Sequence, residues 1–167
     1  MTGHGHAESG HEAHKEKKKK LVGEFGIFTL ILIAVVVRIA TNYAQVYSVE
    51  PIIPLAVYAG LAYGTDAGVL VGLVSYPISN IFLIGGAFGL WSFLQGIGGA
   101  ISGWLAGNVK KITKSGLVVY SFVGTLIFEV LVNFPDNELL VWPFSVTHIV
   151  SNIIFAIILG EILIKEK

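Results

Sequence analysis

Residues 38–72 read RIATNYAQVYSVEPIIPLAVYAGLAYGTDAGVLVG, and we interpret the rest of the chain as packing and polar lining around this stretch. Arg38, the only arginine of the sequence, stands near the end of a long apolar run. Small residues then recur at every fourth position: Ala56, Gly60, Gly64, Gly68 and Gly72. An arginine is costly in lipid and is expected to face protein, headgroups or a polar cavity, while small residues let helix backbones approach closely. These features predict a compact helical membrane protein with a polar site near one face.

The composition is that of a membrane protein. Of the 167 residues, 54% are hydrophobic and only 13% are charged, and most of the charges lie outside the long apolar runs. Basic and acidic residues balance at 11 each, so the net charge indicates no nucleic acid or other strongly charged partner. There is no cysteine, which excludes disulfides, thiolate metal sites and a cysteine nucleophile.

Residues 1–20, MTGHGHAESGHEAHKEKKKK, differ in composition from the rest of the chain. They offer almost no apolar surface to bury, so we predict a disordered His/Lys-rich tail ahead of a transmembrane domain over residues 21–167. Removal of Met1 would leave Thr2, Gly3 and His4 at the amino terminus, a set of nitrogens that suits Cu(II) or Ni(II), with His4 as the metal ligand. We favour the alternative, a solvated tail whose lysines meet anionic headgroups.

Six transmembrane helices are predicted, over residues 21–40, 51–64, 66–84, 88–107, 117–134 and 144–164. The second helix is short, since its 14 residues rise only about 21 Å, and it requires shielding by its neighbours or local thinning of the bilayer. Asp66 is the predicted N-cap of the third helix. Pro77, which stands among hydroxyl and amide side chains, predicts a kink or local unwinding in that helix.

The lysines indicate how the chain is oriented in the membrane. Every lysine lies in the tail, in the loop between the fourth and fifth helices, or at the carboxyl terminus. Six crossings place these three regions on one side, which the positive-inside rule makes the cytoplasm. If the second helix did not cross, the loop that holds Lys110 and Lys114 would lie opposite the tail. We therefore predict a multi-pass protein of the cell membrane with both termini in the cytoplasm.

Polar side chains at the outer ends of several helices predict a substrate pocket that opens outward. A guanidinium can hold a carboxylate or phosphate, and a glutamate can pair with an amine or ring nitrogen, which suits a small polar or zwitterionic solute. The alternative is that these groups only satisfy one another, with an Arg38–Glu129 ion pair that clamps the bundle. The candidate binding residues, with Trp142 as an aromatic lid, are Arg38, Asn42, Tyr47, Asn80, Glu129, Asn133, Trp142, His148 and Asn152.

Other motifs limit the chemistry. The glycine ladder, which we define as Gly60, Gly64, Gly68 and Gly72, is expected to serve helix packing or the docking of a partner. The sequence contains no GxxxxGK[ST], HExxH or GxSxG motif. We therefore expect no ATP binding through a P-loop, no enzymatic activity and no cofactor.

The order of these parts resembles the substrate-binding S component of an energy-coupling factor (ECF) transporter, one of the vitamin-uptake relatives of ABC importers. The resemblance covers the six predicted helices and three stretches: TNYAQVYSVEP (residues 41–51), GLAYGTDAGVLVG (60–72) and GIGGAISGWLAGNVKK (96–111). It implies capture of a vitamin or other micronutrient in an outward-facing pocket, with transport driven by a separate membrane T component and two cytoplasmic ATPase subunits. The AxxxA contact surface that the family carries on its first helix is missing here, since residues 27–37 contain only Ala34, and residues 60–72 are its candidate replacement.

Two other classes of function remain open at this point. In a structural or assembly protein, the glycine ladder would mediate oligomerisation and the polar side chains would only set the register of the helices. A small stand-alone transporter is the other alternative, although the chain is short and has no recognisable inverted repeat.

Overall fold

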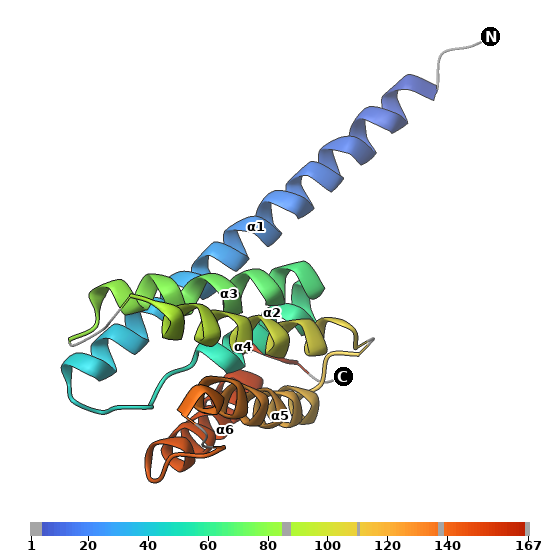
Figure 1. Ribbon diagram of the computed structural model, residues 1–167. Coiled ribbons are helices and arrows are strands. Elements are labelled where there is room, and N and C mark those ends of the chain that lie inside the picture. Colours follow the sequence, from blue (N-terminus) through green and yellow to red (C-terminus); the bar gives the residue numbers. More distant parts are fainter. Residues whose placement is uncertain (1–4, 85–87, 110, 137–138, 166–167) are drawn as a thin grey trace.

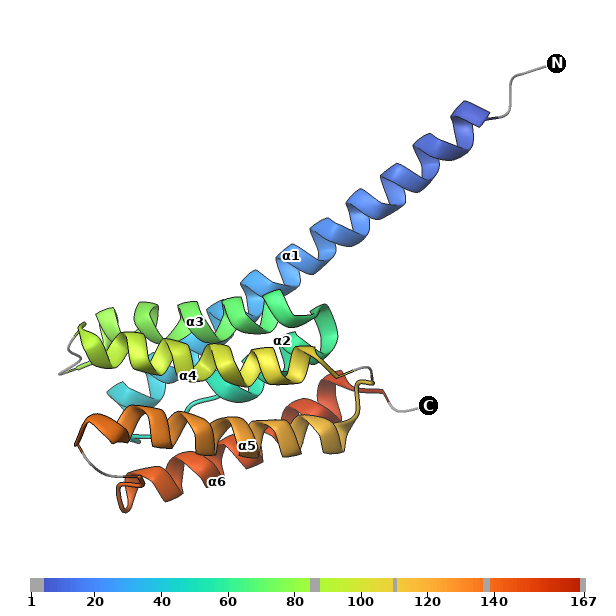
Figure 2. The same ribbon diagram turned by 45° about the vertical axis from the view of Figure 1, so that its right-hand side comes forward.

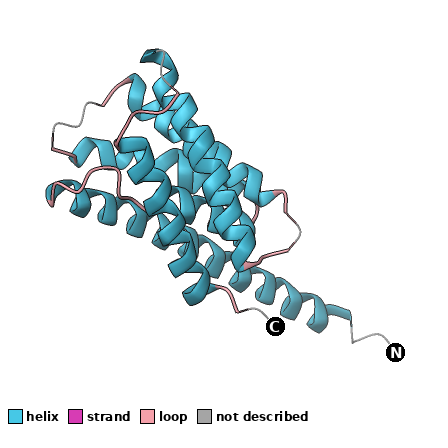
Figure 3. Cartoon of the chain, turned by 90° about the horizontal axis from the view of Figure 1, so that it is seen from below, coloured by secondary structure: helices cyan, strands magenta, loops and turns pink. Residues whose placement is uncertain are grey.

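The computed structural model describes residues 5–84, 88–109, 111–136 and 139–165, with side chains from Gly23 onward. In these ranges all regular structure is helical, which confirms the predicted all-α class (Figures 1 and 3). The elements are α1 (Gly5–Tyr43), α2 (Ile52–Tyr63), α3 (Thr65–Phe82), α4 (Leu90–Gly107), α5 (Lys114–Asn133), the short 3-10 helix η1 (Phe134–Asp136) and α6 (Phe144–Leu163).

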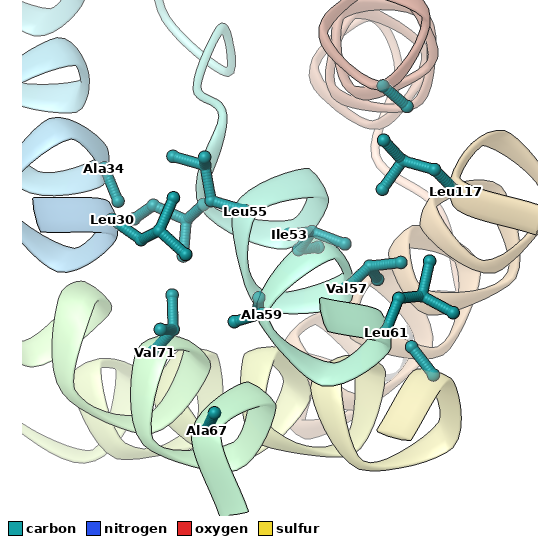
Figure 4. Packing of buried hydrophobic residues seen from close by; sticks show 14 of the residues in the cluster. Leu30, Ala34, Ile53, Leu55, Val57, Ala59, Leu61, Ala67, Val71 and Leu117 are labelled. Atoms are coloured by element: carbon teal, nitrogen blue, oxygen red, sulfur yellow. The ribbon is translucent and has the colours of Figure 1, made fainter. Parts of the chain in front are cut away.

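Helix α2 lies at the centre of the bundle and contacts all five other α-helices. Its sequence, IIPLAVYAGLAY, has no charged residue and is apolar all around, as expected for a helix that is buried on every side. Figure 4 shows Ile53, Leu55, Val57, Ala59 and Leu61 of this helix surrounded by side chains of the neighbouring helices. A helix in this position need not span the bilayer alone, because protein rather than lipid covers it.

The bundle has two chemically different ends. At one end Lys114 Nζ, at the start of α5, pairs with Glu161 Oε2, near the end of α6, at 2.6 Å. At the other end lie the last turns of α1, α3 and α5, the first turns of α4 and α6, and residues 44–51, which we call the connector. The polar side chains described below gather at this second end.

Three of the four glycines of the ladder pack against helices of the same chain. A Cβ on Gly68 would lie 2.6 Å from the carbonyl oxygen of Gly103 in α4 and 2.8 Å from Gly60 Cα, so α2, α3 and α4 meet backbone to backbone. Gly72 lies against the α4 backbone in the same way. Gly64 has a different role, because its φ of +98° forms the turn between α2 and α3. Helix α4 therefore covers Gly60, Gly68 and Gly72, which belong to the surface considered as a replacement docking face.

The predicted N-cap of α3 is wrong, and of the two alternatives predicted at Pro77, a kink or local unwinding, the structure contains no unwinding. The helix begins at Thr65 directly after the turn at Gly64, so Asp66 lies in its first turn and is not the N-cap. The helix also continues through Pro77 without unwinding. Gly96 of α4 provides the space for this, since a Cβ there would lie 2.8 Å from the Leu73 carbonyl oxygen and 3.4 Å from the proline ring. The carbonyl that proline deprives of its helical donor is thus packed against a glycine.

Helix α1 begins at Gly5 and not at Leu21, so the segment predicted to be disordered is helical from Gly5 onward. Alanine, glutamate and lysine, which favour helices, are common in residues 5–20, and a helix nucleated in the apolar run extends through them at little cost. This part of α1 projects away from the bundle (Figure 2). His4 lies outside the described residues, as do the other side chains of the tail, so its metal-binding role stays a prediction.

Length and hydropathy single out three segments that could cross a membrane: Gly23–Tyr43, Lys114–Asp136 and Phe144–Leu163. Helix α2 is apolar but shorter, with 12 residues. Helices α3 and α4 have 18 residues each but contain many glycine, hydroxyl and amide residues. The structure is thus a helical bundle with three long apolar helices, whereas six were predicted to cross.

Candidate functional site

Arg38, in the last turns of α1, joins α1 to α3, α4 and the connector. Its Nε pairs with Glu50 Oε2, and its Nη1 donates to Ser79 Oγ and to Asn80 Oδ1, each at 2.7 Å. Its Nη2 donates to Gln95 Oε1 of α4 at 3.3 Å. Four of the five N–H groups of the guanidinium are therefore directed at acceptors within this chain.

The backbone conformation of the connector places Glu50 next to Arg38. Gln45 and Ser48 both adopt left-handed backbone conformations, with φ of 59° and 61°. The carbonyl of Ser48 then accepts a hydrogen bond from Ser151 Oγ of α6 at 3.0 Å, which ties the connector to the far side of the bundle. Glu50 directly precedes Pro51 at the start of α2 and is only 7% exposed.

The Glu50 carboxyl is held as a carboxylate. Burial by itself raises its pKa, but the positive charge of Arg38 and the interactions with His148 outweigh this and lower the pKa to about 2. Removal of its partner would leave a buried charge uncompensated, which makes the pair a strong constraint on the connector.

A second group of polar side chains joins α5 to α6. His148 Nδ1 lies 2.6 Å from Glu129 Oε1, and Glu129 Oε2 accepts hydrogen bonds from Ser145 Oγ and, at 3.0 Å, from Asn133 Nδ2. His148 Nε2 lies 3.4 Å from Glu50 Oε1 but makes no hydrogen bond. This contact connects the two groups, so a single chain of charges runs from Arg38 through Glu50 and His148 to Glu129.

The alternative of an Arg38–Glu129 ion pair is thus not what the structure contains. Arg38 pairs with Glu50, and Glu129 pairs with His148. Sequence reasoning placed all the charged partners on helices and gave none to the connector, so it missed Glu50.

The rings of Tyr76 and Phe128 pack against the side chains of Arg38 and His148. The guanidinium of Arg38 lies 4.8 Å from the centre of the Tyr76 ring, a cation–π contact. Tyr76 stacks on Phe128 at 4.9 Å, and Phe128 meets the His148 ring edge to face at 4.9 Å. The buried Tyr76 hydroxyl contributes to the lowered pKa of the Glu50 carboxyl.

A cavity of about 180 Å³, which we call the polar pocket, lies among these groups. Its polar lining includes both acidic residues and both basic residues of the network, and its apolar walls are contributed mainly by α5 and α6. The lining residues are Arg38, Ser48, Glu50, Gln95, Phe128, Glu129, Val132, Asn133, Val141, Phe144, Ser145 and His148. A second cavity of about 150 Å³, the connector pocket, lies beside residues of the connector and shares Arg38, Ser48 and Glu50 with the first.

The predicted site residues fall into three sets. Arg38, Glu129, Asn133 and His148 line the polar pocket. Asn42 and Tyr47 line the connector pocket, where Asn42 Oδ1 also accepts a hydrogen bond from the Ile84 backbone at 2.9 Å.

The remaining three predicted residues line neither cavity. Asn80 supports Arg38, and Asn152 is buried and donates to the His148 carbonyl oxygen at 2.9 Å. Trp142 is 77% exposed and lines neither cavity, so its role as an aromatic lid stays a prediction.

Glu50 and Gln95, which line the polar pocket and contact Arg38, are candidate site residues that sequence reasoning missed. Glu50 carried a usable signal, since a glutamate between two apolar segments and directly before a proline is costly to bury without a purpose. Gln95 carried none, because an amide in a glycine-rich helix is common. No group of three His, Asp or Glu side chains in the described part of the chain is arranged to hold a metal ion.

We found no match between this chain and any protein-family model, any curated protein or any solved structure.

Proposed function

We propose that this chain is a membrane-embedded binding protein for a small polar solute, and specifically the substrate-capture S component of an ECF-type importer for a vitamin or other micronutrient. The observation that carries the proposal is the polar pocket, a cavity of about 180 Å³ at one end of the bundle that is lined by four buried charged or titratable side chains. Polar groups at membrane depth are expensive, and their usual role is functional.

Unused hydrogen-bonding capacity supports a ligand over a purely structural network. Nearly all buried polar groups in folded proteins have a partner. Here His148 Nε2, whose side chain lines the pocket, is buried and lacks one among the described residues. A polar solute in the pocket can supply this missing partner.

The proposed topology has six crossings, with both termini in the cytoplasm of a multi-pass protein of the cell membrane. Two features support it: α2 is covered by the five other helices, and α3 and α4 have 18 residues each, enough for about 27 Å. Of the described lysines that flank the helices, Lys111, Lys114 and Lys165 lie at the end opposite the pocket. By the positive-inside rule the pocket then opens outward.

The proposed partners are a membrane T component and two cytoplasmic ATPase subunits. The sequence has no P-loop of its own, which fits a subunit that captures solute and leaves ATP hydrolysis to others. Docking through the glycine ladder is disfavoured, because α4 already covers Gly60, Gly68 and Gly72. The same packing weakens the alternative of an assembly protein that oligomerises through these glycines.

The direct test is to purify the full chain in mild detergent and to identify retained small molecules by mass spectrometry. We expect one polar solute in near-stoichiometric amount. Glu129→Gln should lower its retention or affinity at least tenfold, since a hydrogen bond to a charged group contributes about 1.5–3 kcal/mol. Glu161→Gln is the matched control, because it makes the same change at the opposite end of the bundle and should have no effect.

Purification from native membranes tests the partners. Recovery of a T-type membrane protein with ATPases supports the importer. Recovery of a homo-oligomer without solute or ATPases would contradict the proposal and favour an assembly protein.

A further inference from the structure

We propose that the polar pocket binds a small organic cation with N–H donors, such as a primary ammonium or a protonated ring nitrogen, and that the cation displaces a proton from His148. This inference rests on the proposed binding function and specifies the chemical class of the solute. It also changes the role of Arg38, which becomes a positioning residue for Glu50 and not the ligand of an anion.

Arg38 has little capacity left for a solute. Its Nε and Nη1 groups are directed at Glu50, Ser79 and Asn80, and Nη2 donates to Gln95. At most one Nη2 hydrogen stays free, and a bidentate grip on a carboxylate or phosphate needs two parallel N–H groups. A small anion in the pocket would also face two carboxylates.

The pocket offers acceptors in place of donors. Glu50 and Glu129 both line it, and the Glu50 oxygen that does not pair with Arg38 lies 3.4 Å from His148 Nε2 without a hydrogen bond between them. The apolar walls include Phe128, Val132 and Phe144, which suit the carbon atoms of an organic cation better than a bare metal ion.

The geometry of His148 makes a proton or a cation necessary. Its Nδ1 lies 2.6 Å from Glu129 Oε1 and therefore carries a hydrogen that it donates to the carboxylate. In a neutral imidazole the Nε2 atom would then be an acceptor that faces a second carboxylate oxygen, that of Glu50, at 3.4 Å. Two acceptors in this arrangement repel each other unless a proton on Nε2, or a donor group of the solute, lies between or beside them.

The charge balance of the network also requires either a proton on His148 Nε2 or a bound cation. In the empty site, Arg38 and a doubly protonated His148 balance Glu50 and Glu129, so the network is neutral. With a monovalent cation bound, His148 releases its Nε2 proton to solvent, the cation replaces that charge, and the network is again neutral. Both states avoid a net charge at membrane depth, where such a charge is costly.

The groups around His148 are few. Glu129 faces it from α5 and Glu50 from the connector, while Arg38 of α1 and the Tyr76 hydroxyl of α3 act through Glu50. Helix α2, which also packs on α6, has no charged residue. The exchange of one proton for one cation therefore has a single exchanging group, His148.

The test uses the purified full chain and four probes at constant ionic strength: ethanolammonium, methylammonium, tetramethylammonium and acetate. We expect ethanolammonium and methylammonium to bind and to raise the melting temperature. Their affinity should be in the millimolar range, because such small ligands make few contacts. Tetramethylammonium has the same charge without N–H groups, and it should not bind. Acetate, as an anion, should not bind either.

Calorimetry of ethanolammonium binding in buffers of different ionisation enthalpy measures the proton. We expect one proton released per cation, so that affinity rises up to tenfold per pH unit while free His148 is protonated. His148→Gln should abolish this pH dependence. The number of protons that the wild-type chain releases on binding tests the proposed exchange even if the His148→Gln variant does not fold.

The outcomes separate this inference from the proposed function. Binding of acetate in place of ethanolammonium, or a retained solute that is an anion, overturns the cation site and leaves solute capture intact. Binding of ethanolammonium without proton release overturns the role of His148. Absence of binding by every probe, together with absence of any retained solute, overturns both proposals.

Discussion

Replacement of Arg38 by methionine tests the central pairing of the site. Methionine preserves the apolar stem, but the variant leaves Glu50 as a buried carboxylate without its counter-ion and removes the donor to Ser79, Asn80 and Gln95. Loss of one partner of a buried ion pair costs about 3–5 kcal/mol. We therefore expect Arg38→Met to lower the free energy of unfolding by that amount.

A double-mutant cycle identifies the carboxylate that pairs with Arg38. Glu50→Gln removes the orphaned charge, so the Arg38→Met/Glu50→Gln variant should be more stable than the sum of the single losses by about 2–3 kcal/mol. The second cycle, Arg38→Met with Glu129→Gln, should show a much smaller coupling, because Glu129 pairs with His148. The measurement is reversible unfolding of all variants in mixed micelles. A larger coupling with Glu129 than with Glu50, or an Arg38→Met variant as stable as the wild type, would refute the pairing described here.

Three further predictions concern packing and pH. Gly68→Ala should lose about 1–3 kcal/mol of stability, since the new methyl would lie 2.6 Å from a backbone oxygen. Gly160→Ala, whose methyl would meet Lys114 at an ordinary 3.6 Å, should gain up to about 1 kcal/mol in the same unfolding assay. The pKa of Glu50 in the folded chain is about 2, against 4.5 for an ordinary glutamate, so its contribution of about 3 kcal/mol is complete above pH 4.5 and is lost as the pH falls towards 2. Acid titration of stability should therefore be shallower in Glu50→Gln, and identical profiles would contradict the role of Glu50.

Local sequence patterns determined the helices. Apolar runs bounded by proline, glycine and charged residues placed α2, α4 and α6 within a few residues of their observed bounds. Helical spacing brought Glu129 and Asn133 to one face, and the described lysines Lys111, Lys114 and Lys165 lie together at one end of the bundle. These features are readable because each depends only on residues close together in the chain.

Only the tertiary structure decided which groups meet. The sequence could not say that the glycine ladder would pack on α4, because small residues look alike whether they face a helix of the same chain or a partner. It could not assign Glu50 to Arg38, since the connector reaches that position through two left-handed residues and a hydrogen bond to Ser151. Ion pairs form between groups that folding brings together across long separations in sequence, and neither periodicity nor composition records that distance. The polar pocket is therefore a property of the assembled bundle, while its helices are properties of the sequence.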